Sequence, residues 1–198
     1  MIVFDTTALS FLFIPGYTPS KPVRHGKERL EEFTETMAAS HEKIGIPSPA
    51  LSEFLVACNE KQTDEFLKMV RSSPWLEIMD FDAAAAVEVA MRTRKAIEEK
   101  DKREGLTGDN AKIKFDRQIV GIAIASHATK IISDDKDVKS LGERWGIEVL
   151  RVEDLPIPAS LIPPPLLAAA IEAEEQAAAA HPIPETKKPT LKGGPTQK

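Results

Sequence analysis

The sequence is poor in the features that mark secreted and membrane proteins. It has one cysteine, Cys58, so no disulfide can form within the chain, and nothing indicates an oxidising compartment. No apolar run approaches the roughly 20 residues needed to span a bilayer. The chain begins with the apolar segment IVFD, without the basic region and cleavage site of a signal peptide. We therefore expect a cytoplasmic protein.

The chain also lacks a net positive charge and a glycine-rich phosphate loop. Its formal net charge is −5, so overall basicity does not predict nucleic-acid binding, although a local basic surface is compatible with that charge. His25, His41 and His181 have no metal-ligand spacing, and His127 lies on an apolar helix stripe, where we expect a core histidine. The composition, 42% hydrophobic and 29% charged, is sufficient for one core of ordinary size.

The composition changes near residue 155. Nine of the 15 prolines lie from Pro156 onward, around the alanine-rich segment LLAAAIEAEEQAAAAH, which predicts a helix over 166–181. The closing segment, KKPTLKGGPTQK, has no apolar pattern and predicts disorder. We expect a globular domain over 1–155, followed over 156–198 by a Pro-rich spacer, one helix and a disordered end.

Strand and helix patterns alternate through the first 155 residues. Short apolar strands are expected at 2–5, 43–48, 75–80, 130–135 and 147–152. Helices are expected at 26–43, from a Ser48 cap, at 63–72, from Asp82 to about 103, from Asp109 to about 129, and between the last two strands. Such alternation predicts an α/β fold with a parallel sheet and helices on both faces.

Acidic residues follow several of these strands. Asp5 ends the first strand and Asp135 follows the strand KIIS, while Glu53 lies one helical turn after the second strand. Open parallel sheets bind ligands outside the carboxyl ends of their strands. A purely structural role is an alternative for all three. Aspartate is a common capping residue, and a glutamate in the first turn of a helix interacts favourably with the helix dipole. Glu53 also lies away from the apolar stripe of its helix.

Asp116 is more informative because it lies on the apolar side of a predicted helix. At about 100° per residue it falls within a stripe of apolar positions. The stripe consists of Ile113, Ile119, Val120, Ala123 and His127. A carboxylate that faces the core is unfavourable unless it is paired, hydrogen-bonded or metal-bound. A structural salt bridge to Lys112 or Lys114 is the alternative.

Carboxylates that converge on one sheet edge need a compensating charge. Two unit charges about 4 Å apart repel by roughly 4 kcal/mol at an effective dielectric constant near 20. Three such pairs would cost about 10 kcal/mol, which is comparable with the stability of a domain. Either protons stay on the carboxylates or a cation lies among them. An all-oxygen set suits magnesium or manganese, and such a metal can activate water and hold a phosphate oxygen.

Four segments resemble, in order, the signature segments of PIN-domain ribonucleases, with the VapC-like branch as the most similar. They are IVFDTTALS, SPALSEFL, KFDRQIVGIAIASHATKIISDDKDV and IEVLRV. The resemblance covers most of residues 1–155. It implies a three-layer α/β/α sandwich with a short central parallel sheet, which cuts RNA with Mg²⁺ or Mn²⁺. It also implies two partners, a second copy in a homodimer and a small antitoxin protein.

The resemblance assigns a role to each acid. It implies that Asp5, Asp116 and Asp135 hold the metal and that Glu53 holds it or orients the attacking water. The supporting residues that it implies are Thr7, Ser133 and, as the alternative to Asp135, Asp134. Residues 14–43 and 92–112 are long for a compact toxin, and the Pro-rich tail lies outside the family pattern.

Basic residues beside the acids are expected to contact RNA phosphates, and the candidates are Lys112, Lys114 and Arg117.

Two other classes of function compete with the nuclease: a silent binding module and a different enzyme or receiver with an acidic pocket. A catalytically silent PIN-like module that binds RNA or protein would have no need to retain four mutually repelling acids. A phosphatase of the haloacid-dehalogenase type requires an acid two residues after its aspartate, where this chain has Thr7. A receiver domain requires an acid pair near the end of the first strand, where this chain has only Asp5.

Overall fold

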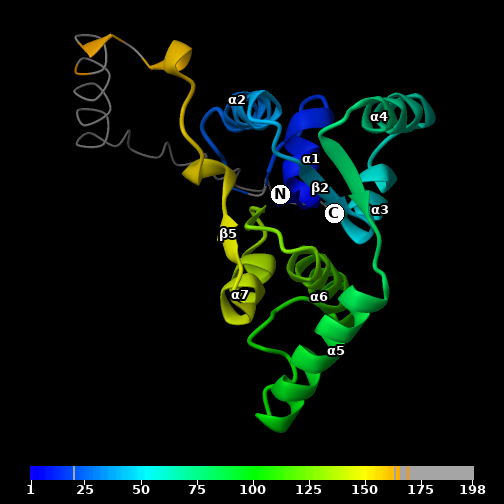
Figure 1. The fold of residues 1–198 in the computed structure, drawn as a ribbon. Helices are drawn as coiled ribbons and strands as arrows, with labels where there is room; N and C mark the ends of the chain where they lie inside the picture. Colours follow the sequence, from blue (N-terminus) through cyan, green and yellow to red (C-terminus); the bar gives the residue numbers. More distant parts are fainter. Residues whose placement is uncertain (20, 163, 166–168, 170–198) are drawn as a thin grey trace, which may run out of the picture. The chain divides into compact units, whose positions relative to one another are not determined.

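The computed structural model describes residues 1–19, 21–162, 164–165 and 169 (Figure 1). It divides into two units, Met1–Pro158 and Ala159–Lys198, and each acid considered above belongs to the first. In the second unit a short 3₁₀ helix, η2, covers Ala159–Leu161. The helix expected over 166–181 lies, apart from residue 169, outside the described residues. None of the described helices is long and apolar enough to cross a membrane.

The first unit is built on a sheet of five short strands. They are β1 (Ile2–Phe4), β2 (Ile44–Pro47), β3 (Leu76–Met79), β4 (Lys130–Ile132) and β5 (Glu148–Leu150). The order across the sheet is β3-β2-β1-β4-β5, and every neighbouring pair is parallel. In the register of the central strand, Ile2 lies opposite Ile44 on one side and Lys130 on the other.

Seven described α-helices cover the two faces of this sheet. They are α1 (Thr6–Phe13), α2 (Gly26–Ala39), α3 (Ser48–Val56), α4 (Glu60–Ser72), α5 (Ala83–Glu98), α6 (Asn110–Ala125) and α7 (Lys136–Trp145), and a 3₁₀ helix, η1 (Val152–Asp154), follows β5. Helices α1 to α4 contribute to one core and α5 to α7 to the other (Figure 1). The three-layer α/β/α sandwich that the sequence predicted is therefore confirmed.

The central strands divide their side chains between the two cores. In β1, Ile2 and Phe4 belong to the core under α1 to α4, and Val3 belongs to the core under α5 to α7. In β4, Ile132 and Ile131 are divided in the same way. Because successive side chains of a strand point to opposite faces, a strand covered on both faces reads as an unbroken apolar run. This is why these strands could be found in the sequence.

Helix α1 is absent from the elements that the sequence predicted. Its segment, TTALSFLF, has only eight residues and no charged side chain, so it lacks the alternation of charged and apolar positions that marks a surface helix. Its N-terminus is set instead by Asp5, whose side chain accepts hydrogen bonds from the backbone of Thr7 and Ala8.

Several helix ends also differ from the expectation. Pro47 rather than Ser48 is the N-cap of α3, and α5 ends at Glu98 instead of near 103. Helix α6 ends at Ala125, and His127 beyond it is exposed with a left-handed φ of 54°. The expectation of a core histidine at 127 is therefore wrong, because the helical stripe stops before that residue.

The chain order places a switch point between the central strands β1 and β4. From β1 the chain runs outward through β2 and β3, and then returns to β4 on the other side of β1. The crevice between two such strands, outside their carboxyl ends, is where α/β sheets bind ligands. Asp5 directly follows β1, and the segment Ser133–Asp135 directly follows β4.

Candidate functional site

Asp5 is buried and held by four hydrogen bonds. Its side chain accepts from the backbone of Thr7 at 2.8 Å and of Ala8 at 3.2 Å, and from the hydroxyls of Thr7 at 2.7 Å and of Ser133. Burial raises the pKa of Asp5, and the hydrogen bonds, that from Ser133 first, lower it. Burial dominates, so the net pKa is about 6. The folded protein therefore holds a carboxylate whose negative charge is incompletely compensated.

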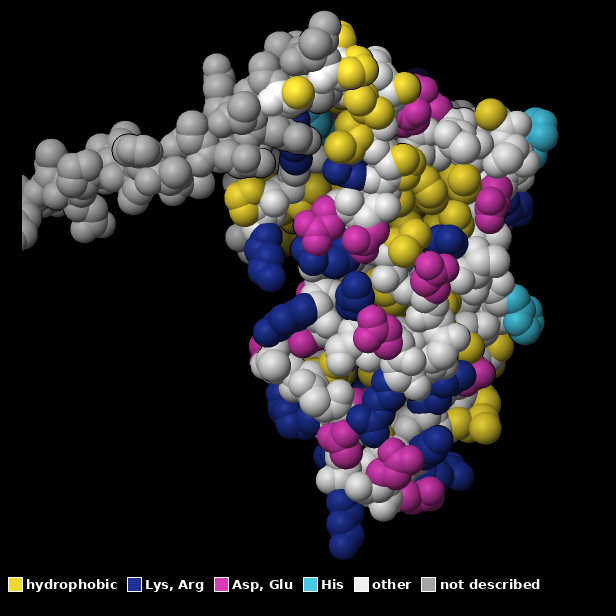
Figure 2. Space-filling view, turned by 90° about the vertical axis from the view of Figure 1, so that its left-hand side faces the viewer, with side chains coloured by type: hydrophobic (Ala, Val, Ile, Leu, Met, Phe, Trp, Pro, Cys, Tyr) yellow, Lys and Arg dark blue, Asp and Glu magenta, His cyan; other side chains and the backbone are white. Residues whose placement is uncertain are grey.

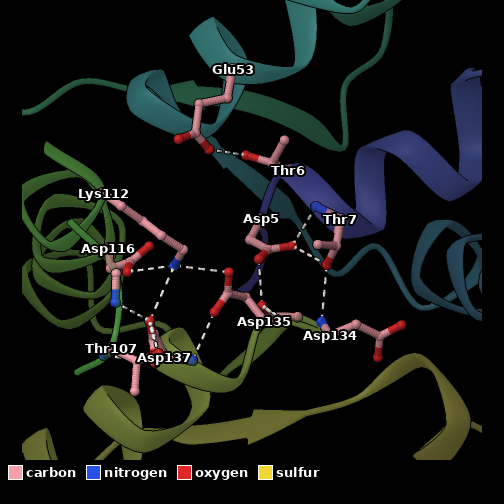
Figure 3. Close-up of polar contacts among 12 residues, drawn as sticks. Asp5, Thr6, Thr7, Glu53, Thr107, Lys112, Asp116, Asp134, Asp135 and Asp137 are labelled. Atoms are coloured by element: carbon pink, nitrogen blue, oxygen red, sulfur yellow. Dashed lines mark hydrogen bonds and ion pairs between the residues drawn. The ribbon is translucent and has the colours of Figure 1, made fainter. Parts of the chain in front are cut away.

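Two hydroxyl groups connect Asp5 to the loop after β4. The Ser133 hydroxyl donates to Asp5 and accepts from the backbone N–H of Asp135 at 3.0 Å. The Thr7 hydroxyl donates to Asp5 and accepts from the backbone N–H of Asp134 at 2.9 Å. The structure thus brings Thr7 and Ser133 against Asp5, where they fix the two strand ends to each other; Figure 3 shows Thr7 between Asp5 and Asp134.

Asp116 lies on α6 and shares a positive charge with Asp135. The Lys112 ammonium is 2.8 Å from one oxygen of Asp116 and 2.9 Å from one oxygen of Asp135. Burial raises the pKa of Asp116 to about 6, Lys112 opposes this rise, and the charges of Asp135 and Asp137 add to it. The salt bridge considered for Asp116 exists, but it joins acids from two elements rather than one isolated pair.

Asp135, and not Asp134, faces this shared charge. Asp135 also caps α7 by accepting the backbone N–H of Asp137 at 2.7 Å. The carboxylate of Asp134 points away from Lys112 (Figure 3) and accepts the backbone N–H of Val152 at 2.9 Å. Burial raises the pKa of Asp134, and its second oxygen is buried without a hydrogen-bond partner among the described residues.

Asp137 belongs to the same cluster, although the sequence reasoning gave it no role. It is 4% exposed, and its carboxylate lies 3.6 Å from Lys112 and accepts the backbone N–H of Gly108 at 3.0 Å. Burial raises the pKa of Asp137, but hydrogen bonds from Thr107 and Gly108 and the charge of Lys112 outweigh it, so the net shift is downward. The signal for Asp137 in the sequence was its position two residues after Asp135, at the start of the same helix.

Glu53 is set apart from the other acids. It is exposed on α3 and accepts the hydroxyl of Thr6 at 2.7 Å, the residue next to Asp5. In the described part of the chain, no hydrogen bond or ion pair joins it to Asp5, Asp116 or Asp135 (Figure 3). Thr6 is a second contact that the sequence reasoning missed, and it keeps Glu53 at the same sheet edge.

The three basic residues expected at the RNA differ in their surroundings. Lys112 is engaged by the acids, and Lys114 is exposed on the same helix. Arg117 is buried and donates to Glu104 at 2.7 Å and 3.0 Å, so its guanidinium is not available to a phosphate. This arrangement disfavours an RNA contact at Arg117, because its helix position faces the segment before α6 and not the strand ends.

The donor chemistry of this cluster suits a hard cation. Among the described residues, no group of three or more His, Cys, Asp and Glu side chains is arranged to hold a metal ion. The ammonium of Lys112 instead lies between carboxylates from α6 and from the β4–α7 connection. Carboxylate oxygens are the ligands that Mg²⁺ and Mn²⁺ favour, so the donor type suits such an ion, while the acids are arranged around the Lys112 ammonium.

A cavity of about 590 Å³ opens beside the cluster. Its walls include Asp135, Asp137 and Lys112, and further basic residues at Lys21, Lys136, Lys139 and Arg151. On α7 the cavity-facing positions Lys136, Lys139, Ser140 and Glu143 follow helical spacing, whereas Val138, Leu141 and Trp145 are buried. The face in Figure 2 likewise carries Lys and Arg side chains interspersed with acidic ones.

Comparisons with known proteins concern the fold. No protein-family model and no curated protein matches the chain. It is similar to a chain of VapBC2 from Rickettsia felis bound to a DNA fragment from its promoter, with 21% identity, a TM-score of 0.48, and coverage of 76% of this chain and 98% of that one. DNA-bound VapBC from Salmonella typhimurium gives 16% identity, a TM-score of 0.48, and coverage of 76% and 97%.

A tyrosyl-tRNA synthetase from Leishmania major, in complex with tyrosinol, is also similar, with 15% identity and a TM-score of 0.44. The match covers 90% of this chain but 33% of the synthetase. The signature segments found in the sequence lie on β1 and α1, on α3, from α6 to α7, and on β5, around a parallel five-stranded sheet. The parallel sheet and the helices on both of its faces, which the resemblance implied, are therefore present.

Proposed function

We propose that the protein is a metal-dependent ribonuclease that hydrolyses RNA phosphodiester bonds. The observation that carries the proposal is the meeting of Asp116, from α6, with Asp135, from the β4–α7 connection, around one positive charge. Asp5 is fastened to the same connection through Ser133, at the switch point of the sheet. Buried acids gathered at a ligand-binding edge are typical of functional sites.

Asp5, Asp116 and Asp135 would hold Mg²⁺ or Mn²⁺, with Glu53 as a further ligand or as the group that orients water. When bound, such an ion stabilises developing negative charge on a phosphate and lowers the pKa of a bound water. The chain itself supplies orientation. Thr7 and Ser133 fix the carboxylate of Asp5, and Thr6 fixes that of Glu53 while leaving it open to solvent.

The cavity beside the acids accounts for the substrate. Lys136 and Lys139 line it from α7, and Lys21 and Arg151 line it from other segments. Cations along a groove attract the phosphates of a nucleic-acid backbone whatever its sequence. We infer that an RNA strand follows this wall, so Lys136 and Lys139 replace Arg117 as the residues expected to contact phosphate.

The proposal includes a cellular role as the toxin of a toxin–antitoxin pair, with a small antitoxin protein and a second copy of this chain as partners. It rests on the sequence resemblance to VapC-like proteins. Induced expression of the wild-type chain in a bacterial host should arrest growth, and the Asp116→Asn chain should not. Equal growth with both chains would remove the toxin role while leaving the nuclease to be judged on RNA.

The decisive experiment incubates the purified protein with a mixed set of fluorescent RNA oligonucleotides in Mn²⁺, Mg²⁺ or EDTA. Asp116→Asn is run in parallel, with Asp64→Asn, an exposed position on α4, as the matched control. We expect cleavage that requires metal, disappears in Asp116→Asn and persists in Asp64→Asn. Absence of cleavage together with absence of metal binding in calorimetry would favour the silent PIN-like module.

A further inference from the structure

Lys112 is surrounded by acids from more than its own helix. Its ammonium lies 2.8 Å from Asp116, 2.9 Å from Asp135 and 3.6 Å from Asp137. Only Asp116 is a helical neighbour four residues away, and the other two belong to the start of α7. Asp116 and Asp137 are nearly inaccessible to solvent, so Lys112 compensates charge that water cannot reach, and at Asp137 it does so together with hydrogen bonds from Thr107 and Gly108.

The local structure is shaped to place this side chain. Asp109 caps α6 by accepting the backbone N–H of Lys112 at 2.8 Å, which fixes the first turn of the helix. A Cβ at Gly108 would stand 2.7 Å from the Cδ of Lys112, so the glycine leaves room for the aliphatic part of the lysine. Gly108 also donates its backbone N–H to Asp137 at 3.0 Å. Lys112 and Asp137 are therefore positioned by the same loop.

The Lys112 ammonium can be reached from solvent. The side chain is 37% exposed and lines the cavity, so a cation can approach the acids from solvent. A lysine side chain has a flexible four-carbon stem, so its ammonium can leave its partners without any change in the backbone.

We propose that Lys112 is a built-in counter-ion that holds Asp116 and Asp135 together in the metal-free protein and is displaced when a divalent cation binds. The inference rests on the proposed function, whose metal ligands include the same two acids. Lysine and metal then compete for the same oxygens, so the lysine sets the concentration of divalent cation at which the site fills. In the metal-free protein Lys112 keeps Asp116 and Asp135 in place by offsetting the repulsion between them.

The test measures metal binding directly and needs no RNA. Mn²⁺ is titrated into wild-type protein, Lys112→Met and Lys112→Gln, with free Mn²⁺ counted by its electron paramagnetic resonance signal. Lys114→Met, an exposed position on the same helix, is the matched control. Because a charge-assisted hydrogen bond contributes roughly 1.5–3 kcal/mol, we expect both Lys112 variants to bind Mn²⁺ at least about tenfold more tightly than wild type.

Thermal unfolding of the same four proteins in EDTA provides the second readout. We expect both Lys112 variants to unfold at a lower temperature than Lys114→Met, and added Mn²⁺ to raise their unfolding temperature more than that of wild type. Equal Mn²⁺ affinity in wild type and both Lys112 variants, or weaker affinity in the variants, would overturn the counter-ion alone. Absence of Mn²⁺ binding in all four proteins would overturn the metal site itself and the inference with it.

Discussion

At the scale of single residues, Asp5 and Asp116 illustrate a site that opposes folding. Each is buried, and burial raises the pKa of each to about 6. The hydrogen bonds and the lysine around them lower these values without restoring the ordinary one. The folded protein thus keeps charges that the unfolded chain would hold more favourably, which is typical of residues retained for function.

The pH dependence of stability should report the charge on Asp5. A carboxyl with a pKa of about 6 when folded and 3.8 when unfolded favours the folded state below pH 4, and this contribution is lost as pH rises through 6. The loss amounts to about 3 kcal/mol. Asp5→Asn should therefore show less decline in unfolding free energy between pH 4 and pH 7 than wild type, measured by urea denaturation in EDTA. Parallel pH profiles for the two proteins would contradict it.

Asp116→Asn should leave the protein folded. The substitution removes a buried negative charge, and Lys112 keeps its contact with Asp135 at 2.9 Å. We expect a thermal unfolding temperature equal to or above that of wild type, together with loss of metal-dependent cleavage. If Asp116→Asn unfolds while Asp64→Asn does not, Asp116 is a structural member of an ion-pair network and not a site residue.

At the scale of elements, α6 carries two separate charged systems. Near its N-terminus Lys112 and Asp116 face the strand ends and α7, and the next residue, Arg117, forms a buried pair with Glu104. Glu104 also accepts the indole N–H of Trp145 on α7 at 2.8 Å. The first system is proposed to bind a metal, and the second fastens α6 and α7 to the turn that precedes α6.

Arg117→Met should destabilise the fold without a specific effect on RNA. The change leaves Glu104, whose side chain is 1% exposed, without its closest positive partner. Removing one member of a buried pair costs about 3–5 kcal/mol, whereas an exposed substitution such as Lys114→Met stays within about 0.5 kcal/mol. Urea denaturation of the two variants measures the difference. Full stability of Arg117→Met combined with weakened RNA binding would restore the sequence expectation for this residue.

At the scale of the whole molecule, the proposed site is confined to the unit Met1–Pro158. Its acids follow β1 and β4 or lie on α3, α6 and α7, and its cavity is lined by residues between Pro19 and Arg151. All the residues of the proposed site that are described here belong to this first unit.

Deletion of residues 160–198 should spare catalysis. We expect the truncated chain to cleave RNA in Mn²⁺ with a rate within about twofold of the full chain, because every proposed ligand and cavity residue remains. The measurement is the fluorescent oligonucleotide assay on both chains at equal concentration, with circular dichroism to verify that the truncated chain is folded. Complete loss of cleavage by a folded truncation would assign the tail a role in activity.

The sequence by itself determined the sheet and where the acids fall along it. Unbroken apolar runs marked the strands, and the helical stripe marked Asp116 as a core-facing carboxylate, because both patterns depend on local periodicity alone. Asp5 could be placed at the sheet edge for the same reason. Helix α1 could not be found, because its segment is short and uncharged and its start depends on a cap.

Only the tertiary structure decided which charges meet. The packing of α6 against α7 joins Lys112 to Asp135 and Asp137, turns Asp134 away, and pairs Arg117 with Glu104. These choices depend on distances between segments that are remote in sequence, and a one-residue difference in a loop is enough to exchange Asp134 for Asp135. Local patterns carry no such distances, so the identity of the acids was readable in the sequence and their pairing was not.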